Sequence, residues 1–482
     1  MNINNFSIDK SDDVIKQTNN LVGYIEKKIN TKNFSSLAFL ISNSFNLPIY
    51  VTKFEIKKYL SDNHNFRVGK FSNEFKLINL FTSSIQYIFS FIFIFTFSLN
   101  SKKIKKSEII FDEVLSNEEL ERSYSILNKF ISHTIITSQK LKNLENCFIY
   151  RKQIGASRQF IKKHFFSIIF KNLIKSIKLS FKEKANMIPF LLDQTKKIIK
   201  YETVFQKFQA KFLIQERPYT TSAIKNYLFK KYGGKKTCCT QRIIFHLGST
   251  SFYINSDILF SLGNETAKIL ELTGSKIKKI NPVGSTVFSS KWIKSEKLKT
   301  EHFDIIHLSG NDAPYFMTDN NYLDNYYKQL RWLKKLSIDF PNLKIVVKHH
   351  EGNKFNDQKE ISILKSANIK RISGPTNPGK ANYSYGYAIN SSLRLTWCST
   401  MAYELIGHGY PCYFLDPKMQ NNAFLHNYNF NKKFRIANYE RLKLIVNEMI
   451  NKKQNKNINN KESFCINSFN VEEKIYSELK DY

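Results

Sequence analysis

A strand, a helix and a second strand follow one another between residues 303 and 350, and this order restricts the fold more than any other feature. "FDIIHLSGND" is an apolar run that ends in a glycine loop, "NNYLDNYYKQLRWLKKL" has apolar residues at helical spacing, and "NLKIVVKHH" is a second apolar run. A crossover of this length joins parallel strands in a right-handed unit. His349 and His350 are therefore expected at the carboxyl end of a strand.

The same alternation extends to both sides of this unit. Upstream, "RIIFHLGS", "SDILFSLG" and "KIKKINPVGS" are predicted strands. Downstream, "NIKRISG", "LRLTW" and "YPCYFLDP" are predicted strands, "NYSYGYAIN" a short helix or turn and "CSTMAYELIGHG" a helix. Alternating strands and helices are typical of α/β proteins, and 482 residues are enough for two or three domains.

Residues 77–99, "LINLFTSSIQYIFSFIFIFTFSL", form an uncharged segment whose length fits a membrane span. Several polar residues dilute it, and basic residues on both sides assign no orientation. A span, an interfacial helix and a buried core helix all stay open.

Residues 159–184 are predicted to form a basic amphipathic helix. Phe166, Phe170, Leu173 and Ile177 recur at helical spacing, with lysines beside them. Such a helix can lie on an anionic membrane surface. A solvated helix that covers a domain core is the alternative, and for this segment alone the pattern favours it.

The composition restricts partners and compartment. The net charge of +34 suits anionic membranes, polyanions or phosphate-bearing substrates, although Lys, Asn, Ile and Phe are abundant throughout. No arginine-rich arm concentrates the charge, so we expect no nucleic-acid partner. The six cysteines show neither zinc-site spacing nor the density of a disulfide scaffold, which indicates a reducing cytoplasm, and the N-terminus has no signal-peptide pattern.

Ser399 and Thr400 stand where the helix after "LRLTW" should begin. An N-cap hydroxyl, unpaired backbone N–H groups and the positive end of the helix dipole bind anions such as phosphate. Glu404, one turn later, could accept hydrogen bonds from ribose hydroxyls. An ordinary capped helix is the alternative, and the local pattern alone favours it.

Two further loops are expected at the same edge of a parallel sheet, where ligands collect. Neighbouring strand residues point to opposite faces, so His349 and His350 are unsuited to one metal ion, and no metal site is predicted. One of them is expected to face the ligand with Lys348 or Glu351. Two further candidates for the binding site remain. The backbone N–H groups of the small Ser309-Gly310 turn could approach a phosphate. His246 in the preceding domain could reach the same cleft from the other side, or it could be an ordinary strand-end residue.

The order of "IIFHLGS", "DILFSLGNETAKIL", "KINPVGS", "LKIVVKHHEG" and "LTWCSTMAYELIGHGYPCYFLDP" resembles bacterial surface-polysaccharide glycosyltransferases of the GT-B superfamily. This broad group includes capsule and lipopolysaccharide enzymes, polysialyltransferase-like enzymes and CDP-glycerol glycerophosphotransferases. The resemblance covers roughly residues 210 to 450. It implies an α/β fold of two facing Rossmann-like domains with a central cleft.

Residue by residue, the resemblance implies that Ser399, Thr400 and Glu404 hold the nucleotide donor, together with His349 or His350. The sequence departs from the family pattern at Glu351, where relatives often have proline. A further motif of some relatives is present only as His246-Leu247-Gly248.

We therefore expect three regions. Residues 1–298 are the acceptor-side domain with a helical, membrane-leaning insertion, residues 299–455 bind the nucleotide donor, and residues 456–482 are a polar linker and a terminal helix.

The implied activity is metal-independent and cofactor-free transfer of a sugar from a nucleotide-activated donor to a cell-surface polysaccharide or a lipid-linked acceptor. We expect it at the cytoplasmic face of the membrane, with a peripheral or single-span attachment. The candidate catalytic residues are Glu216, Glu351 and His246, of which the two glutamates are candidates for the base that an inverting transfer needs. Two rival hypotheses are transfer of glycerol phosphate from CDP-glycerol and a non-enzymatic membrane- or polyanion-binding protein.

Overall fold

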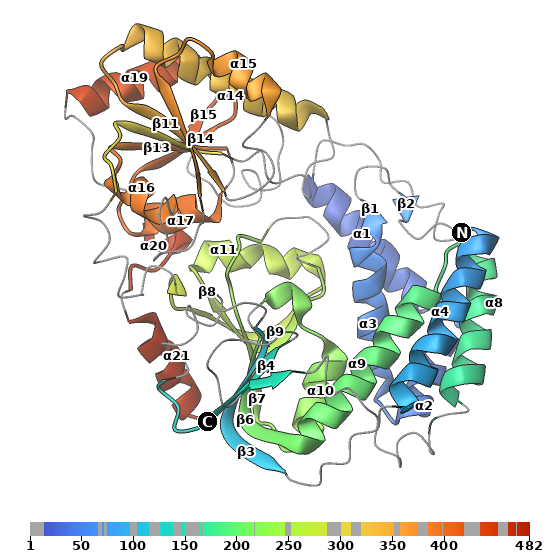
Figure 1. Cartoon of the computed structure of the whole chain (residues 1–482). Coiled ribbons are helices and arrows are strands. Elements are labelled where there is room, and N and C mark those ends of the chain that lie inside the picture. Colours follow the sequence, from blue (N-terminus) through green and yellow to red (C-terminus); the bar gives the residue numbers. More distant parts are fainter. Residues whose placement is uncertain are drawn as a thin grey trace.

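The computed structural model describes residues 14–65, 70–71, 75–96, 104–114, 126, 128–137, 147–149, 164, 167–215, 217–245, 252–286, 300–309, 320–350, 357–374, 384–397, 399–418, 434–451, 461–468 and 470–482. Within these residues the chain forms two parallel β-sheets, a layer of helices packed beside the first sheet, and a C-terminal segment that returns to the first sheet (Figure 1).

The second sheet matches the sequence prediction closely. Its strands, all parallel, are β10 (Ile305–Leu308), β11 (Ile345–His350), β12 (Ile369–Gly374), β13 (Leu393–Thr396), β14 (Cys412–Leu415) and β15 (Arg435–Ile436). The spatial order β12-β11-β10-β13-β14-β15 is that of a Rossmann sheet. The order reverses between β10 and β13, and this is the place where such sheets bind ligands.

Three helices of this domain fall on segments that the sequence predicts as helical: α14 (Asn320–Asp339), α16 (Ser384–Asn390) and α17 (Thr400–Gly407). Two more, α15 (Gln358–Leu364) and α19 (Tyr439–Ile450), were not predicted. On α14, Tyr326, Leu330 and Leu333 are buried as their spacing predicts, whereas Leu323 is partly exposed.

The first sheet has the same order with one more strand. It comprises β3 (Lys105–Val114), β4 (His133–Thr137), β5 (Cys147–Ile149), β6 (Phe208–Gln215), β7 (Lys236–Thr240), β8 (Asn255–Ser261) and β9 (Lys276–Pro282), all parallel, in the order β5-β4-β3-β6-β7-β8-β9. Shorter elements near these strands are η3 (Pro218–Thr220), α11 (Asn264–Lys268) and η5 (Ile269–Thr273). Two facing Rossmann-like domains, the predicted fold class, are thereby confirmed.

One strand prediction is wrong over the residues that the structure describes. "RIIFHLGS" begins after β7 has ended at Thr240; residues 241–245 belong to no strand, and residues 246–249 lie outside the described residues. Gln241 instead fixes the turn, because its Oε1 accepts from the N–H of Leu262 and its Nε2 donates to the carbonyl of Thr266. Ile244 and Phe245 are apolar because they are buried in a core cluster shared by both domains.

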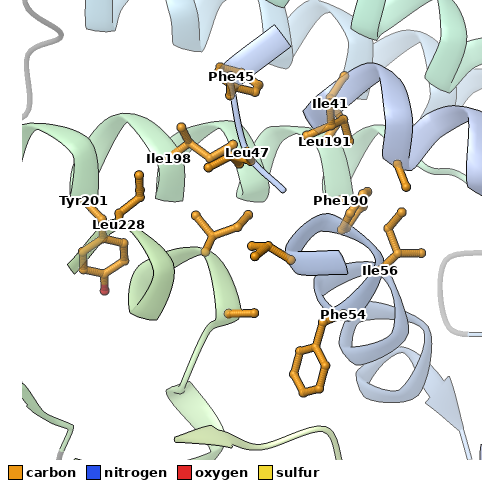
Figure 2. Close-up of a cluster of buried hydrophobic side chains, with 14 of the residues drawn as sticks. Ile41, Phe45, Leu47, Phe54, Ile56, Phe190, Leu191, Ile198, Tyr201 and Leu228 are labelled. Atoms are coloured by element: carbon orange, nitrogen blue, oxygen red, sulfur yellow. The ribbon is translucent and has the colours of Figure 1, made fainter. Parts of the chain in front are cut away.

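A helical layer covers part of the first sheet. It consists of α1 (Val14–Ile29), α2 (Lys32–Phe45), α3 (Ile49–Asp62), α4 (Leu77–Thr96), the π-helical turn η2 (Ser167–Asn172), α8 (Leu173–Glu183), α9 (Ile188–Lys207) and α10 (Ala223–Lys231), with a hairpin of β1 (His64–Asn65) and β2 (Lys70–Phe71). Figure 2 shows its core, in which Leu47 lies near Ile198 and Ile41 lies near Leu191. Burial of these side chains holds the layer together.

Both N-terminal segments of special composition are helical where the structure describes them. Residues 77–96 form α4, and the 159–184 segment is represented by His164, η2 and α8 with its C-cap Lys184. Across the described helices, α4 included, none has the combination of length and apolar composition that a membrane crossing requires.

The C-terminal segment links the two domains. α20 (Lys461–Phe464) packs against α17 of the second domain and α11 of the first, and α21 (Val471–Lys480) buries Val471, Ile475 and Leu479 against the first sheet. The helix predicted for "VEEKIYSELKDY" is α21.

Candidate functional site

A cavity of about 350 Å³ lies at the carboxyl ends of both sheets. The first domain contributes Gln241, Arg242, Ile243, Ser285 and Thr286, and the second contributes Leu308, Ser309, Lys348, Ser384, Tyr385, Ser399, Thr400, Met401 and Glu404. Its volume falls within the range of small-molecule sites, and it opens at the reversal point of the second sheet, between the ends of β10 and β13.

The N-terminus of α17 points into this cavity. The buried strand β13 ends at Thr396, and Ser399 then takes the N-cap position with extended backbone angles (φ −152°, ψ 133°). Its hydroxyl does not cap the helix, and the Thr400 Oγ1 accepts the N–H of Ile244 at 3.0 Å. The first N–H groups of a helix have no partner inside it, so this end carries partial positive charge toward the cavity.

Glu404 joins the two domains inside the cavity. Its side chain is buried; Oε1 accepts from Ser285 Oγ at 2.6 Å, and Oε2 accepts from the Tyr385 hydroxyl at 2.5 Å. Ser285 follows β9 of the first domain, whereas Tyr385 lies on α16 of the second. A carboxylate has about four lone-pair sites, so Glu404 keeps capacity to accept ligand hydroxyls as well.

Two basic side chains line the cavity from opposite domains. Lys348 is buried near the end of β11, where its Nζ donates to the carbonyls of His349 (2.6 Å) and Gly374 (2.9 Å). Arg242 is half-buried and follows β7. Among the described lining residues, these two cations and the α17 N-terminus oppose one carboxylate, Glu404, an arrangement that favours an anionic ligand.

His349 does not share this cavity, which corrects its expected role in donor binding. It follows Lys348 in β11, and neighbouring strand residues point to opposite faces. Its imidazole is fully buried, with Nε2 2.7 Å from Oε1 of Glu360 on α15. His349 therefore connects β11 to the helices on the face of the sheet away from the cavity.

Glu360 is the centre of a buried network that reaches the cavity through Ser309. Arg371 Nε donates to its Oε1 at 2.6 Å, and the Tyr326 hydroxyl donates to its Oε2 at 2.7 Å. Burial raises the Glu360 pKa, but hydrogen bonds from His349, Tyr326 and Arg371 outweigh this and leave the pKa below its ordinary value. The Tyr326 hydroxyl also lies 3.0 Å from Ser309 Oγ, so the network fixes one wall of the cavity.

The structure thus brings together five of the predicted residues: Ser309, Lys348, Ser399, Thr400 and Glu404. Glu216, His246, Gly310 and Glu351 lie outside the described residues, as does the side chain of His350, and their roles stay predictions. Within the described part of the chain, no group of His, Cys, Asp and Glu side chains has a geometry that could hold a metal ion.

Sequence reasoning missed the residues that the first domain contributes, chiefly Arg242 and Ser285, and also Tyr385 on α16. A signal for Ser285 was present, because it ends the predicted strand and turn "KIKKINPVGS". Arg242 opens the run "RIIFHLGS", so the expectation of a strand there hid its position after β7.

Comparison with known proteins gives the following. No protein-family model and no curated protein matches the sequence. Solved structures with a similar arrangement include the UDP-GlcNAc 2-epimerase of Neisseria meningitidis bound to UDP-GlcNAc, which is 12% identical with a TM-score of 0.46 and covers 78% of this chain and 100% of its own.

Two other similar structures are the S. aureus MnaA complex with UDP and the wall teichoic acid polymerase TagF. The first is 11% identical with a TM-score of 0.42, covering 78% of this chain and 96% of its own. The second is 9% identical with a TM-score of 0.44, covering 84% of this chain and 98% of its own. Our fold assignment depends on the strand orders and the facing sheets described above.

Proposed function

We propose that this protein is a glycosyltransferase that moves a sugar from a nucleotide-activated donor to a cell-surface polysaccharide or a lipid-linked acceptor, at the cytoplasmic face of the membrane. One observation carries the proposal. The N-terminus of α17 opens into an interdomain cavity at the reversal point of the second sheet, with Lys348 and Arg242 on either side.

The donor's phosphates fit the positive part of this cavity. Backbone N–H groups at the start of α17 and the Ser399 hydroxyl offer hydrogen bonds, and Lys348 with Arg242 supplies charge. As the bond between sugar and phosphate breaks, negative charge grows on the leaving nucleotide, and fixed positive groups stabilise it. Glu404 is placed one turn along α17, where its carboxylate would accept hydrogen bonds from the ribose hydroxyls.

The acceptor is expected to approach from the first domain. An inverting transfer needs a base that removes the proton of the acceptor hydroxyl. Glu216 and Glu351 stay the candidates for that base and His246 a further candidate catalytic residue, and alanine variants of each are assayed with a saturating donor.

The first experiment measures nucleotide binding by calorimetric titration with UDP, GDP, CMP and CDP compounds. We expect tight binding of one nucleotide class and a loss of tenfold or more in the variants Ser399→Ala and Arg242→Gln, because each removes a contact to phosphate. Asn438→Ala is the matched control: Asn438 caps α19, where its side chain accepts from the Arg441 N–H. Unchanged binding in both cavity variants would sink the proposal.

The second experiment identifies the transferred group. Nucleotide sugars and CDP-glycerol are each incubated with membrane-derived acceptors, and the labelled product is separated from the donor. Sugar in the acceptor fraction supports the proposal, and glycerol phosphate there would assign a glycerophosphotransferase. A nucleotide product that forms without acceptor would indicate conversion of the donor itself.

A further inference from the structure

Part of the exposed surface of α4 is apolar, and the exposed residues Asn79, Thr82 and Gln86 adjoin it. Leu77, Ile78, Phe81, Ile85 and Phe89 fall on one side of the helix, and between 38% and 70% of each is exposed. The opposite side buries Leu80, Tyr87 and Phe91, and α4 packs there against α9. A surface helix ordinarily turns its apolar side toward the core, so a second apolar side in contact with water needs a partner.

A similar exposed apolar row occurs on η2 and α8. Phe170, Ile174 and Phe181 lie in one row along this segment, each about half exposed. A second row, displaced around the helix, contains Lys171, Lys175, Lys178 and Lys182. The exposed side chains described on α4, η2 and α8 include no carboxylate, because Glu183 is buried in an ion pair with Lys28.

Direct contacts join the two segments that carry these rows. The Phe181 ring lies 5.0 Å from the ring of Phe75, just before α4. Asn186 Nδ2, just beyond α8, donates to the Asn79 carbonyl and to Ser83 Oγ on α4. The two helices run side by side at the outer edge of the molecule (Figure 1). We call their exposed apolar and lysine rows together the α4–α8 face.

We infer that the α4–α8 face docks the protein on an anionic lipid bilayer, in the plane of the headgroups. The apolar rows enter the upper acyl region, and the lysines meet the phosphates of acidic lipids. The charge of this face favours an acidic membrane over a second copy of the chain as its partner. Two copies packed through this face would bring lysine rows together without acids to compensate, whereas an acidic membrane neutralises them, and the chain as a whole carries +34. The inference is independent of the reaction assigned to the cavity.

Vesicle flotation tests this inference with the full chain. Vesicles of phosphatidylglycerol and phosphatidylethanolamine are compared with vesicles of phosphatidylcholine, at low and high salt. We expect strong binding to the acidic vesicles, weaker binding to the neutral ones, and a salt effect on the acidic vesicles alone.

Variants separate the two contributions. Phe81→Ser with Phe89→Ser is expected to lower the partition coefficient at least tenfold on both vesicle types. Lys171→Gln, Lys178→Gln and Lys182→Gln together are expected to lower it on the order of 100-fold on acidic vesicles only, which is roughly fivefold per lysine, the equivalent of about 1 kcal/mol each.

Matched controls change exposed residues of the second domain. Ile338→Ser with Leu444→Ser removes two apolar side chains that are 68% and 57% exposed, and Arg331→Gln with Lys335→Gln and Lys344→Gln removes three exposed charges. Circular dichroism verifies that each variant is folded. The inference is overturned if the unaltered chain does not float with acidic vesicles, or if the control variants lose as much binding as the α4–α8 variants. A dimer in solution that Phe81→Ser with Phe89→Ser dissociates would assign the face to a second copy instead.

Discussion

Ser285 and Glu404 hold the two domains together across the cavity: Ser285 Oγ donates to Glu404 Oε1 at 2.6 Å, and both side chains are buried. The same carboxylate accepts the Tyr385 hydroxyl from its own domain. One acid therefore takes part both in the closure of the cleft and in the proposed ribose site.

Removing the interdomain bond should loosen the closed state. In Ser285→Ala we expect a larger radius of gyration by small-angle X-ray scattering and a severalfold lower affinity for the nucleotide. Tyr385→Phe is the matched comparison, because it removes the intradomain bond to the same carboxylate. It should lower the free energy of unfolding by about 1–3 kcal/mol without a change in the radius of gyration. Equal radii for the two variants would refute the interdomain role.

Acid should destabilise the second domain through His307. Full burial lowers the pKa of His307 to about 4, and the hydrogen bond between its Nε2 and Gln329 Oε1, at 3.0 Å, opposes this shift only in part. In the unfolded chain the pKa is near 6.5, so the unfolded state takes up a proton first as the pH falls. The stability that the neutral, buried His307 contributes is therefore fully present above pH 6.5 and is lost as the pH falls toward 4. Between pH 7 and pH 5 the free energy of unfolding should fall by about 2 kcal/mol through this group.

Urea unfolding at pH 7 and pH 5 measures this effect. Protonation of carboxylates with lowered pKa values, such as Glu360 and Asp257, also destabilises the folded protein in acid. The fall in the free energy of unfolding of the wild type alone therefore does not identify His307 as the cause. The variant His307→Gln isolates the histidine, and its stability should fall less between the two pH values. An identical fall in both proteins would show that His307 is not responsible.

A buried ion pair near the reversal point of the first sheet should be costly to break from one side. Lys225 Nζ donates to Asp112 Oδ2 at 2.8 Å, both side chains are inaccessible to solvent, and the Tyr201 hydroxyl donates to the same oxygen. Lys225→Met leaves the carboxylate buried without its cation, and we expect a loss of about 3–5 kcal/mol in the free energy of unfolding. Adding Asp112→Asn to this variant should restore part of the loss. If the loss in the free energy of unfolding of the double variant equals the sum of the losses of the two single variants, Lys225 and Asp112 are not coupled.

Gly407 should not tolerate a larger residue. A Cβ atom at this position would lie 2.3 Å from the Cys465 carbonyl oxygen, where α20 crosses α17. In Gly407→Ala we expect the overlap to outweigh the gain in helix propensity of about 1 kcal/mol and to lower the melting temperature. Gly23→Ala on α1 is the control, since nothing lies within 4 Å of its Cβ position, and its melting temperature should rise. A rise in both variants would contradict the contact.

Chelation should leave the proposed transfer unaffected. Lys348, Arg242 and the α17 N-terminus provide the positive charge that a divalent cation supplies to phosphates in other enzymes. We therefore expect equal rates with EDTA and with added magnesium. A rate restored only by a divalent cation would reject the metal-independent mechanism.

Five strands of the second sheet, β10 to β14, were predictable because each contains a short run with apolar residues that ends in a polar or glycine-containing loop; the two-residue strand β15 was not predicted. Of the first sheet, only β8 and β9 were predicted, and β3 to β7 were not. In β3, four polar residues precede the buried trio Ile109, Ile110 and Phe111, so the sequence "KKSEIIFDEV" resembles a charged loop as much as a central strand. What makes it a strand is pairing with β4 and β6, which lie far along the chain.

The candidate site was predictable to a similar degree. Local pattern predicted that α17 begins after Ser399, and strand geometry predicted that His349 and His350 point to opposite faces. It did not predict which of the two faces the ligand. That choice depends on Glu360 and Tyr326, whose helices cover one side of β11 and bind His349 there.

The return of α21 to the first sheet has a consequence for biosynthesis. Ile109, Phe111 and Phe212 belong to the cluster that Val471, Ile475 and Leu479 complete. A ribosome makes these strand residues more than 250 positions before the helix that covers them. This face of the first sheet therefore stays uncovered until residues 471–479 have been synthesised, and during that interval it is a surface for chaperones or for aggregation.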